Sequence, residues 1–231
     1  MTRLIFSLLF LAVTFPAKAD QPNVLLLGDS ISIGYTPFVQ KALAAEAKVS
    51  RPMAENGKGP ENCQYAAYGL TRLDDWLGDT KWEVIHFNFG LHDLKYIGEP
   101  LPNTTIVPQV GEAIKKHPKA HPLSTPGDYA ANLEKIVQRL EKTGATLIFC
   151  TTTPVPEGSS GRLPGDEVTF NKAAIEVMKK HKVAINDLHA FASTDKVLAA
   201  QNKADVHYSK AGSELLGNHV ASTIRAALEK K

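Results

Sequence analysis

The residues best suited to chemistry begin at position 28, where the sequence reads Gly28-Asp29-Ser30-Ile31-Ser32. The segment follows a short apolar run, so we expect Gly28 to turn the chain and Ser30 to lie at the start of a helix. Backbone N–H groups at a helix amino end lack intrahelical partners, and with the helix dipole they favour a developing negative charge. A nucleophilic serine is suited to this place, although Asp29, Ser30 or Ser32 could equally serve only as the helix cap.

An aspartate and a histidine stand near the other end of the chain, as Asp205-Val206-His207. In an extended segment alternate side chains share a face, with Cα atoms roughly 6.5–7 Å apart. The Asp205 carboxylate could therefore orient the His207 imidazole as a general base. Taken alone, a surface pair of the same spacing would look no different.

A third polar segment, Asn88-Phe89-Gly90-Leu91-His92-Asp93, ends another apolar run. Asn88 or His92 could donate a hydrogen bond to an oxyanion. His92 could equally be an ordinary loop or capping histidine. For Asp93 we expect a structural role as a hydrogen-bond acceptor.

Alternating apolar runs and amphipathic stretches must position these segments. The alternation predicts an α/β protein, a five-stranded parallel sheet with helices on both faces. The carboxyl ends of parallel strands meet at one edge, so the polar segments should converge there. The predicted strands span 23–28, 49–52, 83–90, 145–150 and 183–186, and the predicted helices span 36–47, 64–77, 128–142, 166–180 and 209–229.

The three segments together resemble the SGNH, or GDSL, hydrolase family. Residues 28–32 look like its first block, which holds the nucleophile; Gly90-Leu91-His92-Asp93 resembles its third block, Gly-x-Asn-Asp; and residues 205–207 resemble its fifth, Asp-x-x-His. The resemblance implies a flavodoxin-like three-layer α/β/α sandwich and ester hydrolysis without a metal. It also implies a Ser30, His207 and Asp205 triad.

Two blocks depart from the family pattern. The family's asparagine is His92 here, so the oxyanion donor would be an imidazole N–H, or else Asn88 would take that role. In the fifth block Asp205 stands two residues before the histidine, because the residue three before it is Ala204.

The second block of the family, which offers a backbone N–H to the oxyanion beside that of Ser30, matches least well. The aligned position is Cys63, and Gly59 and Gly57 lie just upstream. A backbone donor does not require glycine, so all three remain candidates. Cys63 and Cys150 could pair in an oxidising compartment or be buried thiols.

The first nineteen residues read as a secretory signal peptide. Arg3 precedes an apolar run over 4–13, and Ala17-Lys18-Ala19 forms a small-residue cleavage site before Asp20. The apolar run is about half the roughly 20 residues of a membrane-spanning helix. We therefore expect a secreted or periplasmic protein without a stable membrane anchor, with one domain over 20–231.

Within that domain, residues 94–127 form a proline-rich insertion at the predicted ligand edge of the sheet. A connection this long is rare without a use. It could be a lid or recognition loop, or a passive insertion.

The remaining patterns exclude other function classes. Without residues 1–19 the chain has 24 basic and 24 acidic residues, so nothing in its net charge favours a nucleic-acid partner. Phosphate-binding glycine loops are absent, and prolines follow His117 and His121, so we expect neither a nucleotide cofactor nor a metal.

The sequence thus predicts a serine esterase acting on a small-molecule or glycan ester, with removal of O-acetyl groups from carbohydrates as the leading reaction. The alternatives are a lipid-ester or thioester hydrolase, and a secreted glycan-binding protein that keeps the fold without catalysis. Acyl length, sugar and oligomeric state stay open.

Overall fold

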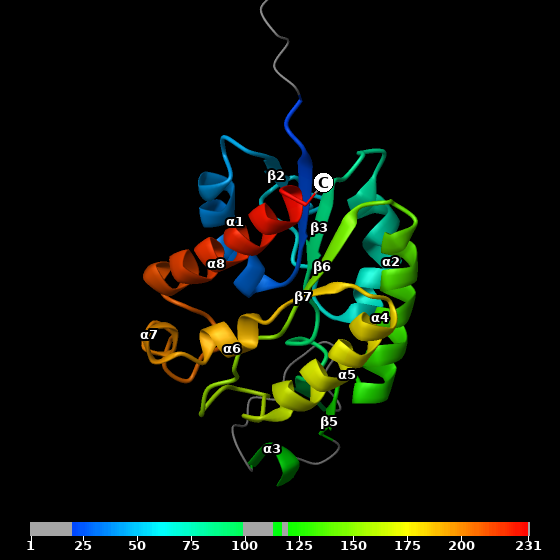
Figure 1. Ribbon diagram of the computed structural model, residues 1–231. Helices are drawn as coiled ribbons and strands as arrows, with labels where there is room; N and C mark the ends of the chain where they lie inside the picture. Colours follow the sequence, from blue (N-terminus) through cyan, green and yellow to red (C-terminus); the bar gives the residue numbers. More distant parts are fainter. Residues whose placement is uncertain (1–19, 99–112, 117–119, 231) are drawn as a thin grey trace, which may run out of the picture.

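A five-stranded parallel sheet forms the centre of the computed structural model, which describes residues 20–98, 113–116 and 120–230 (Figure 1). Its strand order is β2-β1-β3-β6-β7, and all four neighbouring pairs are parallel. The strands are β1 (Asn23–Leu27), β2 (Lys48–Ser50), β3 (Val84–Phe87), β6 (Thr146–Cys150) and β7 (Ala184–Asn186). The expected signal peptide, 1–19, lies outside the described residues.

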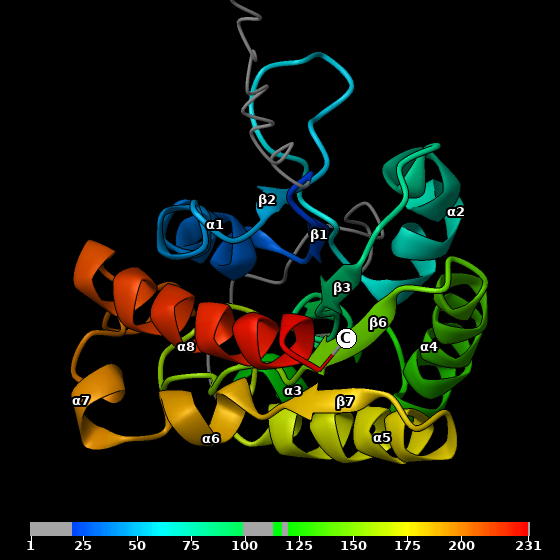
Figure 2. The same cartoon turned by 45° about the horizontal axis from the view of Figure 1, so that its top comes forward.

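Helices cover both faces of the sheet (Figures 1 and 2). On one face lie α1 (Ser30–Ala42) and α8 (Lys210–Leu228), and on the other α2 (Ala66–Leu77), α4 (Pro126–Glu141) and α5 (Asp166–Lys180). This three-layer α/β/α arrangement confirms the predicted fold class. The order of the strands reverses direction between β1 and β3, which is where open sheets of this kind bind ligands.

The core forms where the apolar patterns of the sequence meet. All four residues of β3 are buried, and so are the last four of β1, as expected for strands covered on both faces. The apolar stripe of α4 faces inward through Leu133, Ile136, Val137 and Leu140, each fully buried. Trp76 of α2 is also buried, so it packs as a core residue.

The structure differs from the predicted elements mainly at short segments. Helix α1 begins at Ser30, six residues earlier than predicted, because Asp29 caps it there. The short helices α6 (Leu188–Ala192) and α7 (Asp195–Leu198) were not predicted, because one turn leaves too little periodicity to detect. None of the helices in the described ranges is long and apolar enough to cross a membrane.

The described parts of the insertion pack against the body of the protein. Strand β4 (Tyr96–Ile97) pairs with β5 (His121–Pro122) in a small antiparallel ribbon, and α3 (Ala113–Lys116) places Ile114 against Leu163. Residues 99–112 and 117–119 lie outside the described residues, so the expected lid stays a prediction.

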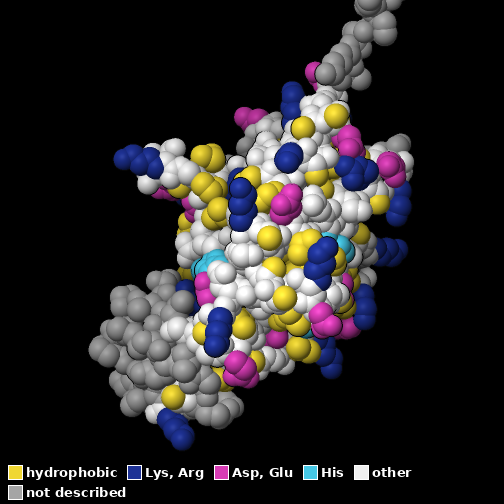
Figure 3. Space-filling view, turned by 90° about the vertical axis from the view of Figure 1, so that its left-hand side faces the viewer, with side chains coloured by type: hydrophobic (Ala, Val, Ile, Leu, Met, Phe, Trp, Pro, Cys, Tyr) yellow, Lys and Arg dark blue, Asp and Glu magenta, His cyan; other side chains and the backbone are white. Residues whose placement is uncertain are grey.

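Charged side chains are mixed in sign on the face that carries α1, α7 and α8. Figure 3 shows lysine, arginine and acidic side chains interspersed over the described surface in that view. The described residues in this view form no broad patch of one sign for a polyanion such as a nucleic acid.

Helices α1 and α8 approach each other closely at Gly217. A Cβ added to Gly217 would lie 2.6 Å from the Phe38 Cβ and 2.9 Å from the Tyr35 carbonyl oxygen. Both distances are shorter than any ordinary contact of a methyl group, and one partner is backbone, which yields little. A glycine is therefore required where α8 crosses α1.

We expect Gly217→Ala to lower the free energy of unfolding by about 1–3 kcal/mol, because the added methyl group overpacks the helix crossing. Gly127→Ala is the matched control, since its Cβ would meet only the Thr125 Oγ1, at 3.8 Å. The control should instead stabilise the protein by roughly 0.4–1 kcal/mol. Urea denaturation of both variants measures the difference, and equal stabilities would contradict the crossing constraint.

Candidate active site

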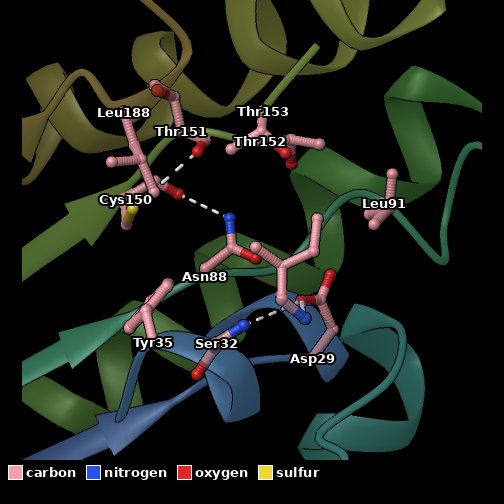
Figure 4. Close-up of a pocket in the computed structure, with 11 residues that line it drawn as sticks. Asp29, Ser32, Tyr35, Asn88, Leu91, Cys150, Thr151, Thr152, Thr153 and Leu188 are labelled. Carbon is pink, nitrogen blue, oxygen red and sulfur yellow. Dashed lines mark hydrogen bonds between the residues drawn. The ribbon is translucent and has the colours of Figure 1, made fainter. Parts of the chain in front are cut away.

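Ser30 lies at the first position of α1, directly after the end of β1. The Asp29 carboxylate accepts hydrogen bonds from the backbone N–H groups of Ile31 (2.9 Å) and Ser32 (3.4 Å), as Figure 4 illustrates. Asp29 is therefore the helix cap, which leaves the Ser30 hydroxyl free for another partner. The preceding turn needs Gly28, because a Cβ there would lie 2.7 Å from the Ser32 Cβ.

A chain of two short hydrogen bonds joins Ser30 to the other end of the sequence. The Ser30 Oγ lies 2.8 Å from the Nε2 of His207, and the His207 Nδ1 lies 2.7 Å from the Oδ1 of Asp205. An ionised carboxylate can only accept, so the imidazole carries its proton on Nδ1 and Nε2 accepts from the serine hydroxyl. This is the geometry in which a histidine can remove a proton from a serine.

Asp205 reaches His207 through a turn and not through the extended backbone that we predicted. Its Oδ1 accepts from the His207 backbone N–H (3.3 Å) as well as from the ring, which is an Asx turn. Partial burial opposes ionisation of Asp205, but the hydrogen bonds from His207 outweigh it and lower the pKa of the carboxyl. The carboxylate is thus ionised at neutral pH and holds the imidazole in one tautomer.

The Ser30 hydroxyl opens into a cavity of about 320 Å³. Seven of the nine lining residues are polar, so the cavity offers hydrogen-bonding groups to a ligand. The lining residues are Ser30, His92, Ser159, Ser160, Arg162, Ala204, Asp205, Val206 and His207.

His92 lines this cavity beside the candidate triad. Burial, with Lys95, Arg162 and His207 nearby, lowers the pKa of His92 to about 4. Its Nδ1 is buried without a hydrogen-bond partner in the described part of the chain. A neutral imidazole carries one N–H, so His92 keeps one proton to donate, and its role as an oxyanion donor stays a prediction.

Asn88, our alternative side-chain oxyanion donor, lies apart from the cavity and has another partner. Its side-chain Nδ2 donates to the Cys150 carbonyl oxygen at 2.7 Å, a bond that Figure 4 shows between neighbouring strand ends. Asn88 does not line the cavity that contains Ser30. This bond holds the end of β3 to the end of β6.

Cys63 was the expected second backbone donor, and the structure contradicts this too. The Cys63 N–H donates to the Gly28 carbonyl oxygen at 3.2 Å, so it is not free for an oxyanion. Gly57 donates its own N–H to the Ala54 carbonyl, and neither Gly57 nor Gly59 lines the cavity. Among the candidate oxyanion donors, the cavity brings together Ser30 and His92.

Both cysteines are buried free thiols. Burial raises the pKa of the Cys63 thiol to about 12, so it stays protonated. In the described ranges, no three side chains of histidine, cysteine, aspartate or glutamate gather as a metal site would need.

Asp93 acts as the buried acceptor that we predicted. Both carboxylate oxygens accept from the Ala66 N–H at the start of α2 (3.1 Å), and Oδ1 accepts from the Ser124 hydroxyl (3.2 Å). Burial outweighs these bonds and raises the pKa of Asp93 to about 7. Asp93 thereby joins the His92 segment, α2 and the far end of the insertion.

Arg51 fixes the turn that carries Ser30, and no pattern in the sequence predicts this role. Its guanidinium donates to the Gly28 carbonyl (3.1 Å) and the Ser32 hydroxyl (3.0 Å), and also to Thr36 and to the Glu61 carbonyl. Burial lowers the pKa of Arg51. A single basic residue after a short strand has no motif by which it could be found.

Arg162 is a second arginine that the sequence did not reveal. It lies in the loop after β6, is 7% exposed, and donates from Nε to the Leu91 carbonyl oxygen at 3.0 Å. It lines the cavity with Ser30 and His207, so a guanidinium borders the candidate nucleophile.

The sequence matches the GDSL-like lipase/acylhydrolase family over residues 26–215. The chain therefore belongs to this family and is an ester-bond hydrolase. A comparison with curated proteins gave no match.

Solved structures share the fold at low sequence identity. A lipase/acylhydrolase from Enterococcus faecalis is 20% identical with a TM-score of 0.63, covering 89% of this chain and 96% of its own. An acetyl xylan esterase is 13% identical with a TM-score of 0.60, over 87% and 99% of the two chains. TesA is 16% identical with a TM-score of 0.58, over 89% and 99%.

The raised pKa of Asp93 predicts a pH-dependent effect of Asp93→Asn on stability. The unfolded carboxyl ionises near pH 4 and the folded one near pH 7, so the wild type loses stability relative to the variant as pH rises between these values. The destabilisation by Asp93→Asn should be largest below pH 4 and shrink towards pH 7. Denaturation at several pH values measures it, and a constant difference would show that Asp93 titrates alike in both states.

Proposed function

We propose that the protein is a serine esterase in which Ser30 is the nucleophile, His207 the general base and Asp205 its orienting carboxylate. The observation that carries this proposal is the hydrogen-bond chain from Ser30 through His207 to Asp205, with bonds of 2.8 and 2.7 Å. A non-catalytic carbohydrate-binding protein would have no need of this alignment between two ends of the sequence.

In the proposed reaction the Ser30 Oγ attacks the ester carbonyl while His207 Nε2 takes the hydroxyl proton. Asp205 stabilises the imidazolium, which then protonates the departing alcohol. Water, deprotonated by the same imidazole, cleaves the acyl-serine and releases the acid.

The oxyanion formed in each half-reaction would be stabilised by the Ser30 N–H and an N–H of His92. Ser30 lies in the first turn of α1, where the helix dipole adds favourable potential. With a pKa near 4, His92 stays neutral at the pH where His207 must act as a base, so it can donate without adding a second titrating base.

For the substrate we propose an O-acetylated carbohydrate. The hydrogen-bonding side chains that line the cavity support a sugar as the alcohol part of the substrate, and an acetyl xylan esterase shares the fold. Lipid esters and thioesters are the second candidate, since a lipase/acylhydrolase and TesA share it too. The leader-like residues 1–19 support a secreted or periplasmic enzyme.

We expect the purified protein to hydrolyse 4-nitrophenyl acetate faster than 4-nitrophenyl octanoate at pH 8, and Ser30→Ala to lower turnover by about 10⁴- to 10⁶-fold. Ser193→Ala, which removes an exposed hydroxyl outside the cavity, is the control and should keep full activity.

A preference for octanoate would move lipid esters ahead of carbohydrates. Equal rates for Ser30→Ala and wild type would exclude Ser30 as the nucleophile.

Two substitutions test His92. His92→Ala removes the imidazole donor, so kcat should fall by roughly 10²–10³-fold. His92→Asn restores an N–H donor of the kind that the resemblance places there, and it should keep more activity than the alanine variant. If both variants lose activity equally, or neither does, a side-chain donor at position 92 is excluded.

A further inference from the structure

Arg162 is a buried cation with unused hydrogen-bonding capacity. Of its guanidinium nitrogens, only Nε has a protein acceptor in the described chain, the Leu91 carbonyl. Asp29 and Asp205 attract it from a distance, but neither forms an ion pair with it. Burying an arginine without a carboxylate costs free energy, so its remaining donors call for a partner.

The same wall of the cavity holds another polar group without a partner. The Ser159 hydroxyl is buried, and it makes no hydrogen bond in the described part of the chain. Ser159 and Arg162 both line the cavity that contains Ser30. A buried hydroxyl without a partner, beside a guanidinium with donors to spare, is typical of a surface completed by a ligand.

The loop that carries these donors is held against the site from three sides. The Gly161 carbonyl accepts from the Tyr96 N–H (2.7 Å), and Arg162 bonds to Leu91, next to His92. A Cβ on Gly158 would lie 2.9 Å from the Cβ of Ala204, next to Asp205. The guanidinium thus has a fixed place beside the candidate triad, as recognition of one substrate group requires.

We propose that Arg162, with Ser159, binds a carboxylate on the alcohol part of the substrate, so that the enzyme selects acetyl esters of acidic sugars. The inference rests on the proposed function, because an acetyl group has no charge of its own and the anion must belong to the sugar. A planar guanidinium matches a carboxylate with two parallel hydrogen bonds. A neutral sugar would leave the cation unpaired.

The test compares two acetylated oligosaccharides of one uronic acid, one with free carboxylates and one with the carboxylates methyl-esterified. We expect the wild type to have the higher kcat/KM on the free acid. Arg162→Gln should lower the ratio of the two kcat/KM values by roughly 10- to 100-fold, the value of a charge-assisted hydrogen bond. Arg162→Lys keeps the positive charge but loses the two parallel N–H donors of the guanidinium, so it should retain part of the preference for the free acid.

Lys203→Gln is the matched control, since it removes the same charge from an exposed position in the turn before Asp205. The control should leave the ratio unchanged, which excludes a general electrostatic attraction. Thermal unfolding of each variant identifies a loss of fold, which would reduce both kcat/KM values alike.

Two results would overturn the proposal: a wild type that prefers the methyl ester, or an Arg162→Gln variant with an unchanged ratio. Failure of the proposed function is recognised separately, as no Ser30-dependent hydrolysis of either oligosaccharide. In that case calorimetric titration with the deacetylated oligouronide tests the carboxylate site by itself. If Arg162 binds a carboxylate, the wild type should bind the oligouronide and Arg162→Gln should not. Equal binding to both proteins would exclude it.

Discussion

The close approach of α1 and α8 is the constraint on which the site depends. Ser30 begins α1, and His207 stands just before Ser209, the cap of α8, so the two functional side chains lie at the amino ends of two packed helices. Their 2.8 Å hydrogen bond joins residues 177 positions apart. Gly217 packs directly against the backbone of α1, so the distance between the two helix axes is fixed. The distance between the Ser30 and His207 side chains is fixed with it. The core thus fixes a distance that no local interaction at either segment could set.

Buried polar groups then fix the loops that the helices leave free. Arg51 holds the nucleophile turn to the segment at Glu61, and Asp93 joins the loop of His92 to the start of α2. These two side chains make hydrogen bonds to backbone groups that would otherwise need water, so the loops keep their positions without regular secondary structure. The burial that makes these contacts effective also shifts the pKa of both groups towards their neutral forms. Rigidity at the sheet edge is therefore coupled to pH through Asp93.

Most of the fold follows from patterns that the sequence carries locally. A short apolar run such as the one in β1, bounded by turn residues, is typical of a buried strand. Both ends of helices α2, α4, α5 and α8 lie within two residues of the predicted bounds. The start of α1 was missed because Asp29 caps it by a side-chain contact that periodicity does not record. One-turn helices and the two-residue strands β4 and β5 depend on tertiary packing, which no local pattern contains.

The site residues were predictable where the residue type alone implies the chemistry. They were not predictable where a hydrogen-bond partner in the folded chain determines the role of a residue. Ser30, Asp205 and His207 came together. By contrast, the one backbone N–H of Cys63 is bonded to Gly28, and Asn88 lies apart from the cavity with its amide bonded to Cys150, which only the folded chain shows. Tertiary structure also explains why the aspartate stands two residues before His207 and not three, as the family pattern has it. With Ala204 in a left-handed conformation, φ 56°, the chain turns, and the Asp205 carboxylate accepts from the backbone N–H and from Nδ1 of His207. Because Gly158 packs on that same Ala204, the turn that orients the base also supports the loop of Arg162. A change in this turn would therefore disturb the His207 imidazole and the Arg162 guanidinium together.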